Sequence, residues 1–193
     1  MQRDLVKKNL NSSFLNVEKD TLRIIRKLFV ESRPYSDILK ALLVVNGNDV
    51  LKNMKNPVYH QAIQQATPTW LKDNDYILTV PKINIQEFDE KKSFLLITFD
   101  NFTPNDTNPQ FRDCIVTIDI ICHLDLWDLG DYQLRPLKIA GYVDGILDNT
   151  HLTGIGTFQF LGGGMLKFNE QLAGYSLMYR AVHGSDDKIP DEG

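Results

Sequence analysis

The first candidates for chemistry in this sequence are carboxylates. Five aspartates lie close together in the second half of the chain, a density that can indicate a metal site: Asp113, Asp119, Asp125, Asp128 and Asp131. They lie along a predicted strand and the loop after it, and this segment lacks the glycine-bracketed ligand loop of a calcium site. We therefore interpret them as a solvated face and as helix caps.

A second acidic candidate is the triplet Asp89-Glu90-Lys91, which has the D-x-K pattern of metal-dependent nucleases. It lies in the turn-like run FDEKKS, and no partner acid precedes it. A metal-dependent enzyme that processes nucleic acid is therefore kept as an alternative function. Stoichiometric binding of magnesium or manganese in calorimetry is the observation that would favour it.

The cysteines and histidines do not form a ligand set. Metal sites bring Cys and His together at short spacings such as C-x-x-C, whereas Cys122 and His123 are neighbours on one predicted strand and point to opposite faces. Cys114 and Cys122 are about 26 Å apart along that strand, far beyond the ~7 Å limit for a disulfide. Both thiols are expected to be reduced, and neither has a base beside it that would make a nucleophile.

The glycine-rich segments do not match phosphate-binding loops. Gly154-Ile155-Gly156 lacks the third glycine of a dinucleotide fingerprint and precedes a predicted strand, where that motif needs a helix. Gly162-Gly163-Gly164 lacks the Lys-Ser/Thr pair of a P-loop and predicts a turn. The sequence thus predicts a protein that is not an enzyme, with no catalytic residue, no cofactor and no metal.

Size and composition are those of a globular subunit. The chain has 193 residues, 42% hydrophobic and 24% charged, with a formal net charge of -4. An acidic balance argues against a protein that coats nucleic acid through electrostatics. No apolar run of about 18 residues occurs, so we expect no membrane partner, and MQRDLVKKNLNSS has no signal-like stretch.

The first third of the chain has helical periodicity. Apolar residues recur at helix spacing in 17–31, and a second amphipathic helix is predicted around Ile38–Leu43, closed by Gly47 in a left-handed conformation. Residues 49–55 are expected to form a short helix. A further helix through 58–66 follows Pro57, and a break is predicted at 67–69.

From residue 75 onward the periodicity changes to that of strands. We predict strands at 76–80, 94–99, 112–123, 156–161 and 174–180, a hairpin tip at 101–108, and a helix within 132–148 that begins near Arg135. One face of the strand at 112–123 is wholly apolar and should meet the core: Cys114, Val116, Ile118, Ile120 and Cys122. The helix has an apolar stripe made of Leu134, Leu137, Ile139, Val143, Ile146 and Leu147. The fold class is therefore α+β: a mostly antiparallel sheet packed against one main α-helix, with a helical N-terminal third. The predicted divisions are a helical subdomain at 1–70, a core domain at 71–183 and a flexible acidic tail at 184–193.

The order of elements from residue 76 onward resembles the tail-completion, tail-terminator and head–tail joining (neck ring) proteins of bacteriophages. The matching stretches are FLLITFDNFTPNDTNPQFRDCIVTIDIICH, LRPLKIAGYVDGIL, GIGTFQF and GYSLMYRAVHG. The resemblance lies in the pattern and order of elements. It implies a structural virion protein, assembled in the host bacterial cytoplasm, that joins or completes the tail as a ring.

The resemblance also implies how such a ring would be built. Six or twelve copies would join head to tail, each presenting two different patches to its neighbours. The expected partners are further copies, adjacent neck, portal-adaptor or tail proteins, and DNA that passes the channel without specific binding. The residues predicted for the two patches are Phe102 and Phe111 near the hairpin tip, Trp127 and Arg135 before and at the start of the helix, and Gly141 and Gly145, whose four-residue spacing leaves a smooth helix face. A monomeric adaptor that binds protein through the helical third is a further alternative.

Overall fold

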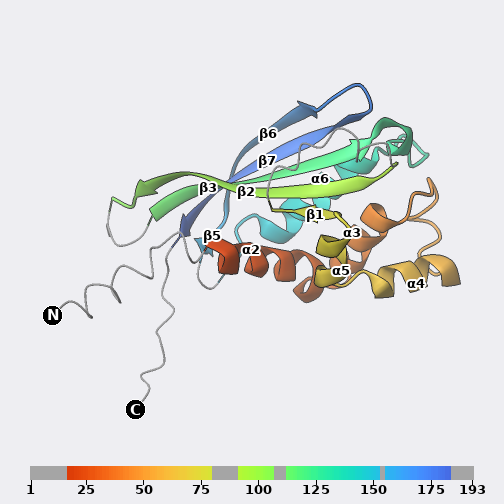
Figure 1. The fold of residues 1–193 in the computed structure, drawn as a ribbon, viewed down its shortest axis with the longest axis horizontal. Coiled ribbons are helices and arrows are strands. Elements are labelled where there is room, and N and C mark those ends of the chain that lie inside the picture. The colour runs from red at the N-terminus through yellow and green to blue at the C-terminus, as the bar shows by residue number, and fades with distance from the viewer. Residues whose placement is uncertain (1–16, 80–90, 107–111, 153–154, 184–193) are drawn as a thin grey trace, which may run out of the picture.

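The computed structural model describes residues 17–79, 91–106, 112–152 and 155–183. Figure 1 shows an α+β fold in which one sheet lies across a layer of helices. The predicted fold class is thus confirmed. The predicted tail at 184–193 lies outside the described residues, and the division between residues 70 and 71 stays a prediction.

The N-terminal helices form as the periodicity predicts. α2 (Val17–Arg26) continues into a π-helical turn, η2 (Lys27–Glu31), and α3 (Tyr35–Val44) follows. The predicted helix at 17–31 is therefore confirmed. Its buried apolar residues are Ile24, Ile25, Leu28 and Phe29, which recur at three- and four-residue intervals and so share one face.

Two capped helices complete this third of the molecule. Asn56 caps α4 (Pro57–Gln65) by accepting a hydrogen bond from the Val58 N–H, and Thr67 caps α5 (Pro68–Asp73) by accepting from the Trp70 N–H. The predicted break at 67–69 is therefore the start of a helix, because Thr67 and Pro68 form an N-cap and first turn. Residues 49–55 form turns and not the short helix that we predicted.

The sheet has five strands in the order β1-β2-β3-β7-β6. These are β1 (Ile77–Leu78), β2 (Ser93–Pro104), β3 (Arg112–His123), β6 (Gln159–Lys167) and β7 (Leu172–His183). Only β1 pairs in parallel, with β2, and the other three pairs are antiparallel. The short strands β4 (His151–Leu152) and β5 (Gly156–Thr157) pair separately.

The predicted glycine turn is wrong. Gly162, Gly163 and Gly164 lie inside β6, opposite Met178, Leu177 and Ser176 of β7. The chain turns further on, where the Asn169 carboxamide oxygen accepts hydrogen bonds from the N–H groups of Gln171 and Leu172. A side chain that satisfies the loop backbone therefore makes the turn, which leaves the glycines in the strand.

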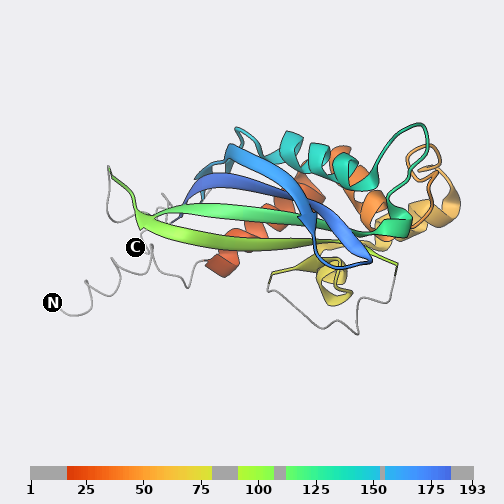
Figure 2. The same cartoon turned by 90° about the horizontal axis from the view of Figure 1, so that it is seen from above.

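All the larger helices pack on one face of the sheet (Figures 1 and 2). α6 (Arg135–Leu147) contacts β3 and β7, and α3 contacts β2. As predicted, the alternate residues of β3 that face this layer are buried: Cys114, Val116, Ile118, Ile120 and Cys122. They share one hydrophobic cluster with the N-terminal helices and α6. Both cysteines are free, as expected.

Candidate subunit interface

Helix α6 carries three of the six predicted interface residues, Arg135, Gly141 and Gly145, and its two faces differ in kind. The inner face is buried and contributes Ile139, Val143, Ile146 and Leu147 to the core. The predicted apolar stripe also included Leu134 and Leu137, but both side chains are exposed. They lie on the outer face, because Leu137, Gly141 and Gly145 are each four residues apart and so lie above one another on the helix.

Arg135 occupies the inner side of the helix start. It is fully buried, and its guanidinium donates hydrogen bonds of 2.7–2.8 Å to four backbone carbonyls, those of Leu126, Leu42, Val45 and Gly47. Burial lowers the pKa of this side chain from its ordinary value. Arg135 therefore belongs to the interior of the subunit, and we remove it from the predicted interface.

The same contacts correct the predicted end of α3. Gly47 was expected to close this helix in a left-handed conformation, but the helix ends at Val44 and Val45 is extended. Leu42 lies in the last turn of α3 and Val45 caps it, so Arg135 supplies donors to the carbonyls that a helix C-terminus leaves unpaired. A cation from a distant part of the chain thus replaces the local glycine cap.

The loop before α6 is held in an uncommon backbone conformation. Gly130, Asp131 and Tyr132 have φ angles of 74°, 50° and 61° in succession, which only glycine adopts without strain. The loop is closed on both sides, because the Gln133 N–H donates to the Gly130 carbonyl and the Arg135 N–H donates to the Trp127 carbonyl. This geometry holds the Tyr132 ring fully in solvent.

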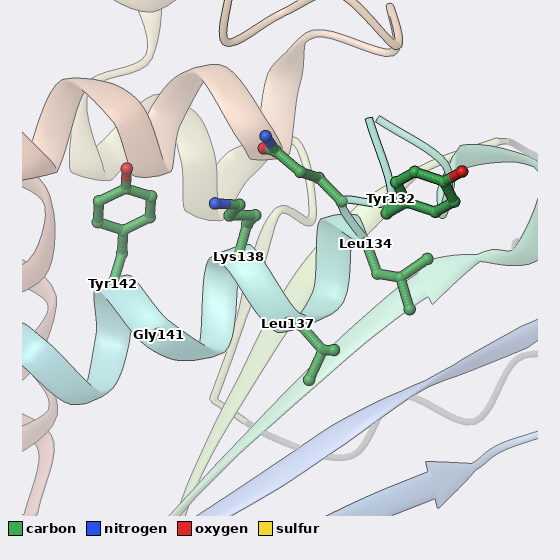
Figure 3. Close-up of a pocket in the computed structure, with 7 residues that line it drawn as sticks. Tyr132, Leu134, Leu137, Lys138, Gly141 and Tyr142 are labelled. Atoms are coloured by element: carbon green, nitrogen blue, oxygen red, sulfur yellow. The ribbon is translucent and has the colours of Figure 1, made fainter. Parts of the chain in front are cut away.

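A shallow depression of about 480 Å³ lies between this loop and the outer face of α6. Figure 3 shows Gly141 at its floor, with Lys138 and Tyr142 on the side of the N-terminal helices and Leu134 and Leu137 on the other. Tyr142 also contacts Tyr35 of α3, with ring centroids 6.0 Å apart. Exposed aromatic and aliphatic side chains around a small floor are typical of a protein-binding surface. We call this surface the α6 face.

The two glycines of α6 have no role in the packing of the subunit. A Cβ atom built on Gly141 or Gly145 would meet nothing within 4 Å. Glycine in an exposed helix interior is about 1 kcal/mol less favourable than alanine. Within the described residues, the packing of the fold therefore does not require glycine at either position.

The other predicted interface residues lie elsewhere. Trp127 is half-buried, and its indole N–H donates to the Cys122 carbonyl at 3.3 Å, so the ring covers its own core. Phe102 stacks on Phe99 at 6.5 Å near the end of β2. Phe111 lies outside the described residues. The structure brings neither Phe102 nor Trp127 into the α6 face, and Tyr132, Leu134, Leu137 and Tyr142 complete it instead.

Three of the five aspartates considered for a metal site form ion pairs. Asp125 pairs with Lys91 at 2.8 Å, Asp131 pairs with Lys52, and Asp113 pairs with Arg180. The Lys91 ammonium lowers the pKa of Asp125, and Arg180 lowers that of Asp113. Within the described residues, no three His, Cys, Asp or Glu side chains lie where they could share a metal ion. Asp89 lies outside that part of the chain.

Buried titratable groups beneath the site serve packing. The Tyr179 hydroxyl, on β7, donates to the Asp144 carboxylate of α6 at 2.9 Å. Burial raises the pKa of the Cys122 thiol to about 11, which keeps it protonated and unreactive at neutral pH. None of the helices in the described ranges combines the length and apolar character needed to span a bilayer.

The fold and the α6 face define an α+β subunit with an exposed surface suited to contact with protein. Residues 36–181 match the model of the YomW family. Because this match covers well over half of the chain, the chain belongs to the YomW family. The match supports a phage-derived protein and assigns no role in a tail, neck or ring. No curated protein matches the chain.

Proposed function

We propose that this protein is a structural virion protein that forms a homo-oligomeric ring at the head–tail junction or tail end of a bacteriophage. The ring joins or completes the tail and surrounds the DNA channel. Its neighbours are other neck, portal-adaptor or tail proteins. The protein works by assembly and catalyses no reaction. The family match supports the phage origin, and the α6 face supports the assembly.

The observation that carries this proposal is the pair of open glycines on α6. An exposed helix surface that gives up stability for small size is best explained by close approach of another backbone. The apolar side chains around the glycines would then be covered by the neighbouring subunit. In a head-to-tail ring every copy offers the α6 face to one neighbour and a different patch to the other.

Native mass across a concentration series, with negative-stain images of the largest species, tests the proposal. We expect closed rings of six or twelve copies of the 22.1-kDa chain. Gly141→Arg places a large charged side chain on the floor of the α6 face without a clash inside the subunit, and we expect it to abolish rings while the melting curve keeps its shape.

The matched control is Gln64→Arg, which adds the same side chain at an exposed position of α4 and should leave ring formation unchanged. Two results would contradict the proposal. One is the absence of any species larger than a dimer at all concentrations. The other is equal loss or equal retention of rings in the two variants.

A further inference from the structure

The outer strand β6 has an open edge and two open faces. It ends the sheet next to β7, and seven of its nine residues are exposed while two are half-buried. Figure 1 shows no other helix or strand of the described residues beyond it. Four large apolar side chains in and just after the strand are exposed: Phe160, Leu161, Met165 and Phe168. A long apolar edge of this kind favours pairing with another strand.

The opposite edge of the sheet is protected. β1 covers β2 only at Leu95 and Leu96. Beyond that point β2 has a register shift between Asp100 and Thr103, with Asn101 at a φ of 54°, and the strand ends at Pro104. A bulge, an exposed carboxylate and a proline are the features by which proteins prevent edge pairing. By comparison, β6 has only one register shift, at Leu161, and one charged residue, Lys167, at its end.

Two of the three glycines in β6 resemble those in α6, because the packing of the subunit does not require them. Gly163 is required by the subunit, because an added Cβ would lie 2.9 Å from the Ser176 carbonyl oxygen and 3.1 Å from Leu177. Gly164 would meet nothing within 4 Å, and Gly162 would meet only the flexible end of Met178 at 3.9 Å. Glycine weakens a strand and often marks the close approach of another backbone.

We infer that β6 pairs with the β6 strand of a second copy, antiparallel, about a two-fold axis at Gly164. Residues that lie opposite each other in a sheet share a face, so a two-fold axis between two identical antiparallel strands must lie midway between the two copies of one residue. With the axis at Gly164, Met165 lies opposite Gly163 of the second copy and Leu166 lies opposite Gly162. Met165 and Leu166 thus each cover a glycine, Leu161 lies opposite Lys167, and no two like charges face each other.

The second copy is the occupant that fits this edge. Within the described residues, β6 is the only long edge without a bulge-and-proline block, so a second β6 is the matching strand that this chain can supply. The two-fold contact relates copies in opposite orientation and therefore differs from the head-to-tail contacts of a ring. It predicts a dimer in solution and does not depend on the proposed function.

Disulfide trapping in the full chain tests this inference. In Gly164→Cys the two thiols would face each other across the axis, within disulfide reach of paired strands. Both native cysteines are buried and should not compete. Under mild oxidation we expect a cross-linked dimer that forms at least tenfold faster than in the control Gly145→Cys, whose site on α6 is equally open.

A second variant makes the test independent of cysteine chemistry. Met165→Lys places two charges at the predicted contact, so we expect Gly164→Cys cross-linking to be lost in the double variant. In the Gly141→Arg background, where ring contacts are not expected, Met165→Lys should convert a dimer of 22.1-kDa chains to monomers. Equal cross-linking of the Gly164→Cys and Gly145→Cys proteins, or a dimer unaffected by Met165→Lys, would overturn the inference. Gly141→Arg should leave the cross-link intact, so failure of the ring and failure of the β6 contact can be told apart.

Discussion

The two faces of α6 differ in what holds them in place. On the inner face every group is engaged: Arg135 donates to four carbonyls, and Asp144 accepts from Tyr179. On the outer face a Cβ atom added to Gly141 or Gly145 would meet no described atom within 4 Å, while Leu134 and Leu137 are exposed. One helix therefore combines a surface that stabilises the subunit with a surface whose composition lowers its stability.

This difference separates the residues that stabilise the fold from those that we propose for assembly. Substitutions on the inner face should change the free energy of unfolding. Substitutions on the outer face should change assembly and leave unfolding nearly unchanged or make the fold more stable. The distinction would not hold if an inner-face substitution left the free energy of unfolding unchanged, or if an outer-face substitution left assembly unchanged.

The largest expected effect is that of Arg135→Met. The substitution leaves four buried carbonyls without donors, and loss of a buried charged hydrogen-bond partner costs about 3–5 kcal/mol. Arg135→Lys should recover only part of this, because an ammonium lacks the planar fork that reaches separate acceptors. Urea denaturation measures the free energy of unfolding of both variants.

Arg33→Met is the control for Arg135→Met. Arg33 is exposed and makes only a 3.8 Å ion pair with Asp37, so we expect a change within about 0.5 kcal/mol. A loss of less than about 1 kcal/mol in Arg135→Met would show that these contacts do not fix α3 against α6.

A smaller effect is expected for Tyr179→Phe, which removes the donor to the Asp144 carboxylate. A hydrogen bond to a charged group contributes about 1.5–3 kcal/mol, and Asp144 is half-buried and can recover some solvation, so we expect the lower end. Tyr175→Phe, in the same strand, should change the free energy of unfolding by no more than about 0.5 kcal/mol. Equal effects of the two would contradict a specific role for the Tyr179–Asp144 bond.

Tyr179 also predicts a pH dependence. Burial and the neighbouring Asp144 raise its pKa above the ordinary value, so the folded state keeps the phenol protonated where the unfolded state ionises. The unfolded chain then binds fewer protons, and stability falls as pH rises above about 10. In Tyr179→Phe this alkaline loss should be shallower, which denaturation midpoints at pH 8 and above would show.

The sequence predicted most of the elements because their signals are local. The alternation in β3 and the Arg-Pro start of α6 were both confirmed. Gly47 and the glycines of β6 were misassigned because glycine is compatible with a turn, a cap or a strand, and distant contacts decide among these. Arg135 was assigned to the surface because its four acceptors are spread over residues 42–126, and no local pattern reveals them.

The α6 face was predicted in part. Gly141 and Gly145 were recognised from their spacing, and the same spacing extended back to Leu137 would have placed that leucine beside them. Tyr132 could not be predicted in this way. Its exposure depends on three successive residues in the left-handed region, a conformation that the sequence signals only through Gly130.

The smallest effect on stability, and one of opposite sign, is expected for Gly141→Ala and Gly145→Ala. Each replaces glycine in an exposed helix interior, so each should raise the free energy of unfolding by about 1 kcal/mol. The added methyl groups also hold a neighbouring backbone further away, so rings should form only at several-fold higher protein concentration. Thermal melts and native mass on the same samples measure both quantities. A more stable protein with unchanged assembly would show that the outer face makes no close contact. A higher free energy of unfolding together with weaker ring formation would show that the glycines serve assembly and lower the stability of the fold.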